Sequence, residues 1–415
     1  MLRALFSGSQ KIKWNALACF TPVKNMMRVF ECTEFVLTLL FAGAVLQSCG
    51  AQQKINTIDV SEFSDSKHHW MDITDHEQVI MPEKNQVEYK PGDVRGIADN
   101  ILLYQQPNGG WPKNYDMLAI LTNDQKKVLA LHKDSLHTTI DNGATYAQIE
   151  YLAKAYMQLN DERYKNAALH GIYYLLEAQY DNGGWPQFYP DTTGYRKYIT
   201  FNDGAMIGVM NVLHEIVEHE SYFNFIDDAL RNDVVTAYNK GIDCILKCQI
   251  LETDKLTVWC QQHDNITLKP TNARAFELAS KASSESVGVV RFLMKVDKPS
   301  DSIINAVKSA VAWFEKVAIV NTRVEEINIK PDTFQFHVAT KDRVVVTDTA
   351  APPIWTRYYM LKTDRPMFAN RDGKVVYSLS EVTEERRTGY AWYGYWPAKL
   401  LEKDYPKWAA KLTGQ

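Results

Sequence analysis

Apolar residues recur at spacings of three and four along most of the chain between residues 144 and 318. This spacing places them on one face of an α-helix, so each stretch is expected to form an amphipathic helix that buries that face. Consecutive helices of this kind pack in pairs, and the pattern therefore predicts three α/α pairs. The six segments are 144–159, 162–180, 205–219, 229–249, 285–296 and 302–318.

Alternation of apolar and polar residues, which is typical of half-buried strands, appears only late in the chain. Short β-branched stretches lie at 325–330, 334–338 and 344–347, shortly before Pro352 and Pro353. They predict a small β element near residues 325–347. The sequence therefore predicts a mainly α protein with a minor β part.

Two motifs occur twice, which supports a structure built from repeated helical pairs. The segment Gln106-Pro-Asn-Gly-Gly-Trp-Pro112 recurs as Gln179-Tyr-Asp-Asn-Gly-Gly-Trp-Pro186. Asn and Gly tolerate positive φ, so the chain can leave a helix and reverse tightly there, and we expect Trp111 and Trp185 to cover these turns. The second motif places Asp141-Asn142 and Asn202-Asp203 directly before predicted helices.

Residues 1–48 are predicted to be a signal peptide. The apolar run Phe35–Leu46 is about twelve residues long, whereas a membrane-spanning helix needs about 20. The run ends in Leu46-Gln-Ser-Cys49, which resembles a bacterial lipobox with Cys49 as the lipidated residue. The competing interpretation is a buried apolar segment that ends at a chance cysteine, and Met26 or Met27 is an alternative start. We expect an exported periplasmic or outer-membrane lipoprotein of a Gram-negative bacterium, exposed at the surface.

The remaining chain divides by composition. Residues 49–90 are polar and weakly patterned and are predicted to be a linker, followed by one domain at 91–415. Three cysteines remain in the folded part, and this odd number argues against a disulfide framework. We expect a monomer that meets the membrane only through the lipid anchor.

Charge and aromatic content narrow the range of partners. The 50 acidic residues slightly exceed the 46 Lys and Arg, which argues against nucleic acid as the main partner. The 22 Tyr, 10 Trp and 16 Phe can fill a core or provide platforms for sugar rings. Composition does not separate these two uses.

The duplicated Asp-Asn and Asn-Asp pairs are the first candidates for chemistry. Capping of the following helices is one interpretation, because Asp and Asn are favoured N-cap residues. If the helices form a toroid, equivalent helix ends lie on one rim and Asp141 and Asp203 could converge there. Convergent carboxylates with amide neighbours suit Ca²⁺ or an acid/base pair.

Several arginines lie among aromatic residues in the second half of the chain. They are Arg274, Arg357, Arg371 and the pair Arg386-Arg387. Each one alone is expected to be a surface or ion-pair residue. Together with Trp and Tyr they suit an anionic sugar polymer, because guanidinium groups bind carboxylates in a bidentate manner and aromatic rings stack on sugars.

Six motifs in this order resemble polysaccharide lyase family 10, the helical pectate lyases, and the resemblance covers roughly residues 90–405. The motifs are Asn108-Gly-Gly-Trp-Pro-Lys-Asn114, Thr139-Ile-Asp-Asn-Gly-Ala-Thr145, Asn182-Gly-Gly-Trp-Pro-Gln187, Phe201-Asn-Asp-Gly-Ala-Met206, Arg274-Ala-Phe-Glu-Leu278 and Arg387-Thr-Gly-Tyr-Ala-Trp-Tyr-Gly-Tyr-Trp-Pro397. The resemblance implies an (α/α)3 toroid with a long groove. It also implies a pectate lyase that cleaves polygalacturonate (pectate) by Ca²⁺-assisted β-elimination.

The resemblance also assigns residues. Asp141 and Asp203 match the Ca²⁺-binding and active-site carboxylates, with Asn142 beside the first. Arg274 matches the family's proposed base, whereas the chemistry of arginine alone favours a carboxylate clamp, because its pKa is above 12. The residues expected to bind substrate are Asn142, Arg357, Arg371, Tyr390 and Trp392.

This chain departs from the family's pattern at two positions near Arg274, with Phe276 in place of Tyr and Ala279 in place of Pro. Two alternatives to a lyase stay open from the sequence. One is a glycan-binding lipoprotein on the same scaffold without catalysis. The other is a uronyl hydrolase on a related toroid.

Overall fold

The computed structural model describes residues 56–73 and 78–413. The described residues belong to one compact unit, and residues 1–55, 74–77 and 414–415 lie outside the described part. The predicted signal peptide and Cys49 therefore also lie outside the described residues. Within 56–73 and 78–413, no helix combines the length and the apolar character needed to cross a membrane.

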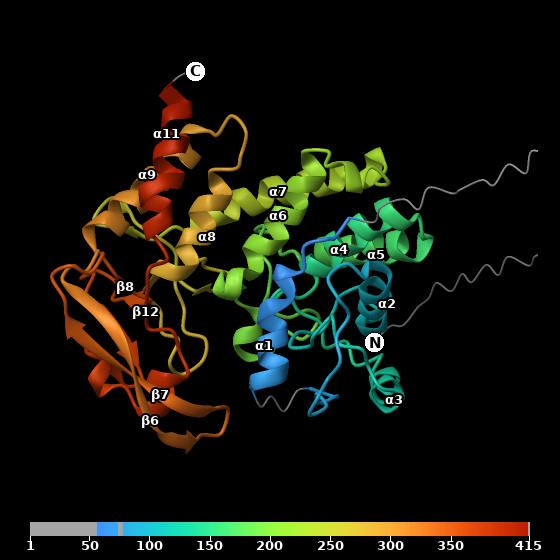
Figure 1. Ribbon diagram of the computed structural model, residues 1–415. Helices are drawn as coiled ribbons and strands as arrows, with labels where there is room; N and C mark the ends of the chain where they lie inside the picture. Colours follow the sequence, from blue (N-terminus) through green and yellow to red (C-terminus); the bar gives the residue numbers. More distant parts are fainter. Residues whose placement is uncertain (1–55, 74–77, 414–415) are drawn as a thin grey trace, which may run out of the picture. The chain divides into compact units, whose positions relative to one another are not determined.

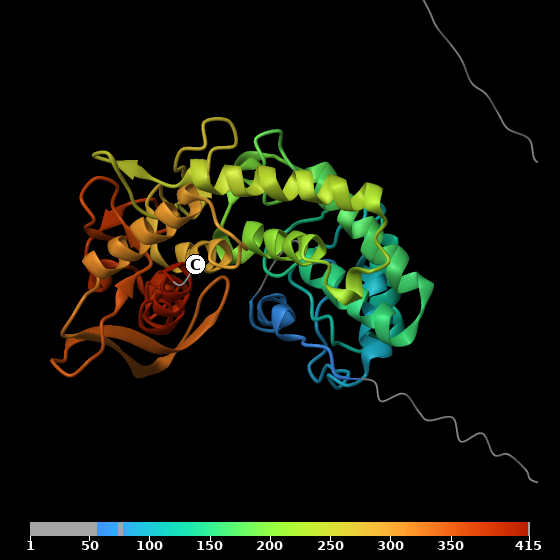
Figure 2. The ribbon, with the colours of Figure 1, turned by 90° about the horizontal axis from the view of Figure 1, so that it is seen from above.

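Seven of the described helices form two layers (Figures 1 and 2). Three inner helices pack side by side in the order α4, α6, α8, and four outer helices pack in the order α2, α5, α7, α9. The inner helices are α4 (Tyr146–Leu159), α6 (Ala205–Val217) and α8 (Ser283–Leu293). The outer helices are α2 (Val94–Tyr104), α5 (Glu162–Ala178), α7 (Asp228–Cys248) and α9 (Asp301–Lys316).

This arrangement confirms the predicted pairs as α4 with α5, α6 with α7 and α8 with α9. The ends of these six helices lie within three residues of the predicted ends. Helix α2 was missed by the sequence analysis, although Val94, Ile97 and Ile101 form its buried stripe. The fold is a mainly α toroid, as predicted.

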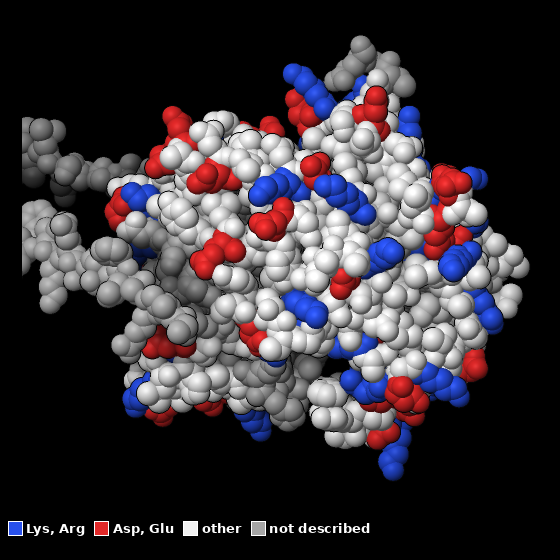
Figure 3. Space-filling view, turned by 180° about the vertical axis from the view of Figure 1, so that it is seen from behind, with Lys and Arg blue, Asp and Glu red and all other residues white. Residues whose placement is uncertain are grey.

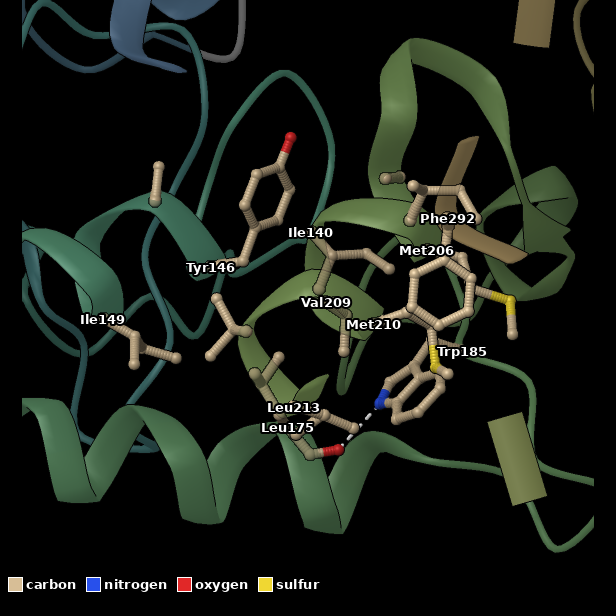
Figure 4. Packing of buried hydrophobic residues seen from close by; sticks show 14 of the residues in the cluster. Ile140, Tyr146, Ile149, Leu175, Trp185, Met206, Val209, Met210, Leu213 and Phe292 are labelled. Carbon is tan, nitrogen blue, oxygen red and sulfur yellow. Dashed lines mark hydrogen bonds between the residues drawn. The ribbon is translucent and has the colours of Figure 1, made fainter. Parts of the chain in front are cut away.

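A buried tryptophan that comes later in the chain packs on each outer helix, and three of the four, Trp111, Trp185 and Trp259, lie in the connection to the next inner helix. Each indole is buried and donates its N–H to a carbonyl in the preceding helix, as the dashed line from Trp185 to Leu175 shows in Figure 4. The expectation for Trp111 and Trp185 is thus confirmed, and both belong to a fourfold pattern. The pairs are Trp111–Ile101 at 2.9 Å, Trp185–Leu175 at 2.7 Å, Trp259–Ile245 at 2.7 Å and Trp355–Phe314 at 2.9 Å.

A glutamine at the end of three outer helices ties each helix to the next one. The side-chain amides of Gln105, Gln179 and Gln249 donate to backbone carbonyls of the following outer helix, each at 2.9 Å. The predicted repeat aligned Gln106 with Gln179, which is wrong by one residue. The backbone N–H of Gln106 donates to the Gly110 carbonyl, and the backbone N–H of Tyr180 donates to the Gly184 carbonyl in the same way. Gln105 is therefore the counterpart of Gln179.

The segment predicted as a linker is part of the fold where it is described. A 3-10 turn (Ser61–Phe63) leads into α1 (Ser64–Asp72), and Phe63, Trp70 and Ile80 are buried in the core shared with the toroid helices. The Trp70 indole donates to the Ile80 carbonyl at 3.0 Å. The polar composition of this segment hid a few large anchoring residues, so the linker prediction is wrong for these described residues.

The main core lies between the two helical layers. Figure 4 shows Met206, Val209, Met210 and Leu213 of α6 packed against residues from neighbouring elements. Three cysteines, Cys244, Cys248 and Cys260, are buried free thiols. On the face drawn in Figure 3, acidic and basic side chains are interspersed.

The predicted β element is a long antiparallel hairpin of β6 (Thr322–Thr333) and β7 (Val338–Thr347), which Figure 1 shows on the opposite side from α2 and α5. The register shifts between Asn328 and Asp332. The predicted strand 334–338 is instead mostly the hairpin turn, where the Phe334 amide bonds the His337 carbonyl at 2.9 Å.

Shorter elements complete the described part. The four-stranded sheet has the order β11-β10-β9-β5, and three two-stranded ladders join β1 to β4, β2 to β3 and β12 to β8. The strands are β1 (Ile199–Thr200), β2 (Leu251–Glu252), β3 (Lys255–Leu256), β4 (Gln262–His263), β5 (Lys281–Ala282), β8 (Trp355–Thr356), β9 (Tyr358–Tyr359), β10 (Pro366–Ala369), β11 (Val375–Val376) and β12 (Tyr393–Gly394). The remaining helices are α3 (Asn123–Leu131), α10 (Glu384–Thr388) and α11 (Tyr405–Thr413).

Candidate active site

The loops before α4 and α6 hold their polar residues in left-handed backbone conformations. Asn142 and Thr145 have φ of 51° and 69° before α4, and Asp203 has φ of 47° before α6. Asn, Asp and Gly accept such angles more readily than other residues, which explains the Asp-Asn-Gly and Asn-Asp-Gly sequences here. The residues at the N-cap positions are Thr145 and Gly204, so neither Asp141 nor Asp203 is the helix cap that the competing interpretation proposed.

Asp141 is almost completely buried, with 2% of its surface exposed. Its Oδ2 accepts a hydrogen bond from the Lys113 ammonium at 2.6 Å, and its Oδ1 is buried without a partner. Burial lowers the pKa of Lys113, but the Asp141 carboxylate outweighs burial and the pKa is raised overall. One oxygen of this carboxylate is thus neutralised, and the other is available for a cation.

Asn142 supports this loop from inside. Its side-chain amide donates to Asn114 Oδ1 at 2.8 Å, and its backbone carbonyl accepts from the Ser66 hydroxyl at 2.6 Å. Only 3% of Asn142 is exposed. The structure thus gives Asn142 a supporting role in the loop, and its binding of substrate stays a prediction.

Asp203 differs from Asp141 in its access to solvent, because 33% of its side chain is exposed. Its Oδ2 accepts from the Asn202 amide at 2.5 Å, and its Oδ1 lies 3.6 Å from the Arg357 guanidinium. Desolvation by the surrounding protein raises the pKa of Asp203 to about 6; Arg357 opposes this shift, and the negative charge of Asp141 adds to it.

Arg357 is held by the third inner helix. Its Nε donates to Glu285 Oε1 at 2.8 Å and its Nη2 to Asn202 Oδ1 at 3.2 Å, and Glu285 lies in the first turn of α8. Burial lowers the pKa of Arg357, but Glu285 more than compensates and the pKa lies well above its usual value. The guanidinium is a fixed positive charge beside Asp203.

A tyrosine network supports the same guanidinium from the other side. The Arg357 guanidinium carbon lies 4.7 Å from the centre of the Tyr390 ring. The Tyr390 hydroxyl lies 2.5 Å from the Tyr358 hydroxyl, which donates to Gln261 Oε1 at 2.7 Å. Burial raises the pKa of Tyr390 to about 12, so the phenol stays neutral at ordinary pH.

Trp392 was predicted to bind substrate together with Tyr390. Its ring is 2% exposed in a second core cluster, and its indole donates to the Arg386 carbonyl at 2.9 Å. The prediction is wrong for Trp392, because a buried ring offers no face to a sugar. Tyr390 is half-buried and remains next to the arginines.

Arg274 is the most accessible of these cations, with 45% of its side chain exposed. Its Nε donates to Glu277 Oε2 at 2.8 Å, its Nη2 is paired with the other Glu277 oxygen, and its Nη1 has no hydrogen-bond partner among the described residues. Desolvation lowers the pKa of Arg274, but Glu277 outweighs it, so the pKa is raised well above its usual value.

Phe276 joins Arg274 to two further arginines. Its ring centre lies 4.9 Å from the guanidinium carbon of Arg274, 5.4 Å from that of Arg371 and 4.7 Å from that of Arg386. The Glu385 carboxylate binds both Arg371 and Arg386 at distances of 2.7–2.9 Å. Arg371 also lines a recess of about 370 Å³ with Phe336, so it borders an open space that a sugar ring can enter.

The structure thus joins Asp203 and Arg357 by an ion pair, and the electrostatic influence of Asp141 reaches Asp203. Four residues of the site were not predicted from the sequence: Lys113, Glu285, Gln261 and Tyr358. Of these, only Lys113 lies within a quoted motif, at the end of Asn-Gly-Gly-Trp-Pro-Lys. The others act through partners that are distant in the sequence.

The donor set allows a test of the implied Ca²⁺. Within the described residues, no group of three or more His, Cys, Asp or Glu side chains could hold a metal. Two hard carboxylates fit Ca²⁺ in kind, and the unpartnered Oδ1 of Asp141 is a free ligand atom. Because Ca²⁺ takes six to eight oxygens, such a site requires oxygens from water or substrate.

Comparisons with known proteins agree with the fold and the motifs. The model of the pectic acid lyase family matches residues 105–401. A family 10 polysaccharide lyase from Cellvibrio cellulosa, solved as a mutant in complex with trigalacturonic acid, is 33% identical with a TM-score of 0.65, over 76% of this chain and 92% of that chain. Another structure of the Cellvibrio cellulosa lyase is 34% identical with a TM-score of 0.65, over 76% and 91% of the two chains. A search of curated proteins finds no significant match.

The family match extends over most of the chain and includes the loops before α4 and α6, Arg274, Arg357, Arg371 and Tyr390. The two solved structures share the fold at an identity above 30% and are covered almost completely. The chain therefore belongs to the pectic acid lyase family and is a polysaccharide lyase.

Proposed function

We propose that this lyase cleaves α-1,4-linked polygalacturonate (pectate) by Ca²⁺-assisted β-elimination. The observation that carries the proposal is the electrostatic link of Asp203 to Asp141 and Arg274, together with its ion pair with Arg357. The trigalacturonic acid bound to the Cellvibrio cellulosa lyase supports the substrate class. A polymer with one carboxylate per ring needs the positive charges that this site concentrates in a chain of net charge −4.

The chemistry of the substrate explains why cations are required. The C5 proton of a galacturonate ring is α to the carboxylate and only weakly acidic. When a base removes it, negative charge develops on the carboxylate; the electron pair then forms the C4–C5 double bond while the C4–O bond breaks and the leaving oxygen takes up a proton. Fixed positive charges aimed at the carboxylate stabilise the charge that develops in the transition state. Arg357, which Glu285 and Asn202 hold in position, is proposed to act as such a charge.

Asp141 and Asp203 would hold the Ca²⁺ ion, with substrate carboxylates completing its shell. The ion would supply further charge neutralisation at the substrate carboxylate. The support in this chain is the free Asp141 Oδ1 and the exposed Asp203 carboxylate. The two are contributed by equivalent loops of the internal repeat.

Arg274 is proposed as the base that takes the C5 proton. Its Nη1 is not engaged by Glu277, and nearly half of the side chain is exposed. The ion pair with Glu277 holds the guanidinium protonated in the free enzyme. A neutral form therefore requires neighbouring cations and high pH, so we expect activity to rise into the alkaline range.

An optical assay tests the proposed function. Elimination creates a conjugated uronide, so polygalacturonate with Ca²⁺ should give new near-ultraviolet absorbance, and a chelator should abolish it. A folded protein that binds the polymer without this signal between neutral and alkaline pH is a non-catalytic glycan binder. New reducing ends without the absorbance identify a uronyl hydrolase, and either outcome rejects the lyase mechanism.

We also propose that the protein is exported and anchored through a lipid on Cys49, as a periplasmic or outer-membrane lipoprotein that acts as a monomer. The support is the sequence pattern of residues 35–49. Labelling with a fatty acid analogue in a bacterial host should modify the native chain and not Cys49→Ala. Labelling of both chains, or of neither, contradicts the anchor. Sedimentation of the chain lacking residues 1–49 measures the oligomeric state, and a stable dimer contradicts the proposed monomer.

A further inference from the structure

Lys113 already occupies one oxygen of the carboxylate that is proposed to hold Ca²⁺. Its ammonium lies 2.6 Å from Asp141 Oδ2 and 5.3 Å from the centre of the Phe188 ring. Only 19% of the Lys113 side chain is exposed. A divalent ion at Asp141 would therefore meet a positive charge within a few ångströms, in surroundings that screen it poorly.

The internal repeat shows that the turn does not require this lysine. Asn108-Gly-Gly-Trp-Pro-Lys113 and Asn182-Gly-Gly-Trp-Pro-Gln187 are equivalent, and their tryptophans make the same bond to the preceding helix. In the second turn this position is held by Gln187, whose side chain is buried and uncharged. A neutral amide is thus compatible with the turn, and the charge of Lys113 calls for another explanation.

We propose that Lys113 is a positioning residue that makes Ca²⁺ binding depend on the polymer. In the free enzyme the ammonium neutralises Asp141 and repels Ca²⁺. When a galacturonate carboxylate enters the site, it supplies a second anion to the ammonium and further oxygens to the ion. Each ligand then strengthens the binding of the other by the same factor, as linkage requires. This inference rests on the proposed Ca²⁺ site and deepens it.

The test is a calorimetric titration with CaCl₂ in the absence of saccharide. Lys113→Gln carries the residue that the second turn has at this position, and it should bind Ca²⁺ about tenfold more tightly than the native protein, a typical size for such coupling. Lys67→Gln is the matched control, because Lys67 pairs with Glu88 and Asp116 instead of Asp141. It should leave the affinity unchanged. If Lys113→Gln does not fold, Lys113→Met keeps the apolar stem and removes the charge.

A second titration adds trigalacturonate, in an Arg274→Ala background so that the saccharide is not consumed. The saccharide should increase the Ca²⁺ affinity more with Lys113 present than with Gln at this position. Equal or weaker Ca²⁺ binding by the Lys113 variants without saccharide overturns this inference alone, if the native site still binds Ca²⁺ when saccharide is present. No Ca²⁺ binding by any variant, with or without saccharide, overturns the Ca²⁺ site and this inference together. An equal gain for Lys67→Gln also overturns it, because the effect is then one of net charge.

Discussion

Asp141 and Asp203 precede two equivalent inner helices, yet their surroundings differ. Asp141 is buried and bound to a lysine, whereas Asp203 is one-third exposed and faces an arginine held by Glu285. The carboxylate also stands at different positions of the repeat, because Asp141 corresponds to Asn202 and Asn142 to Asp203. The repeated backbone thus provides two loops, and different neighbours give the two loops different chemical properties.

The largest effect on turnover is expected from removing the Arg274 guanidinium, the proposed base. Arg274→Ala should lower kcat by about 10³-fold, within the range that a positioned general base contributes. Affinity for trigalacturonate should change little, because Arg357 and Arg371 remain. Stopped assays of kcat and calorimetric binding separate these quantities. Turnover equal to the native rate would remove Arg274 from the base role.

Glu277→Gln distinguishes a base from a carboxylate clamp. The substitution keeps an oxygen that accepts from Arg274 but removes the charge that raises its pKa. If Arg274 is the base, the alkaline rise of kcat moves to lower pH. A profile that keeps its position while KM increases shows a clamp instead.

The next effect compares the two carboxylates directly. Asp141→Asn and Asp203→Asn should each lower kcat/KM by about 100-fold or more, because each removes a proposed cation ligand. Only Asp141→Asn should also destabilise the fold, by about 2 kcal/mol, since it leaves the Lys113 ammonium without its carboxylate. Urea unfolding measures the difference. If both variants lower the free energy of unfolding equally, the two carboxylates contribute equally to stability and the contrast between the loops is wrong.

The pKa of Asp203 gives a pH-dependent version of the same comparison. Its value of about 6 in the folded protein exceeds the unfolded value of about 3.9. The contribution of Asp203 to stability is therefore full below about pH 4 and is lost as pH rises through about 6. Asp203→Asn should remove this loss near neutral pH.

The same titration should appear in the Ca²⁺ affinity. Protonated Asp203 is a poor ligand, so affinity measured with saccharide should fall by about tenfold per pH unit below pH 6. The Asp203→Asn variant provides the reference without this titration. A native profile that is flat between pH 4 and 7 would exclude Asp203 as a ligand that titrates near 6.

The sequence revealed much of the helical framework because local periodicity determines which faces are buried. Six helices followed from spacings of three and four, but α2 was missed because it directly follows a polar segment. The fourfold tryptophan pattern was seen only twice, since Trp259 and Trp355 lack the Asn-Gly-Gly turn before them. Local motifs revealed the turns, and only tertiary packing revealed their common role.

The site was predictable where a motif was repeated and unpredictable where a contact was distant. The loops carrying Asp141 and Asp203 followed from duplication in the sequence. The Lys113–Asp141 and Glu285–Arg357 contacts join residues 28 and 72 positions apart. Trp392 was misplaced because an aromatic motif does not distinguish a buried ring from a sugar platform.

The smallest expected effect concerns the tyrosines on the Asp203 side. Tyr390→Phe removes the hydroxyl that contacts Tyr358 and Gln261, but it keeps the ring on which Arg357 lies. Loss of these bonds should cost about 1 kcal/mol of stability. It should raise KM a few-fold, because Arg357 is less firmly held, and leave kcat nearly unchanged. Ca²⁺ affinity without saccharide should stay constant, since the Lys113–Asp141 pair involves neither tyrosine. A change in that affinity would mean that the two loops are coupled in the free enzyme, and the contrast between them would then be one of degree.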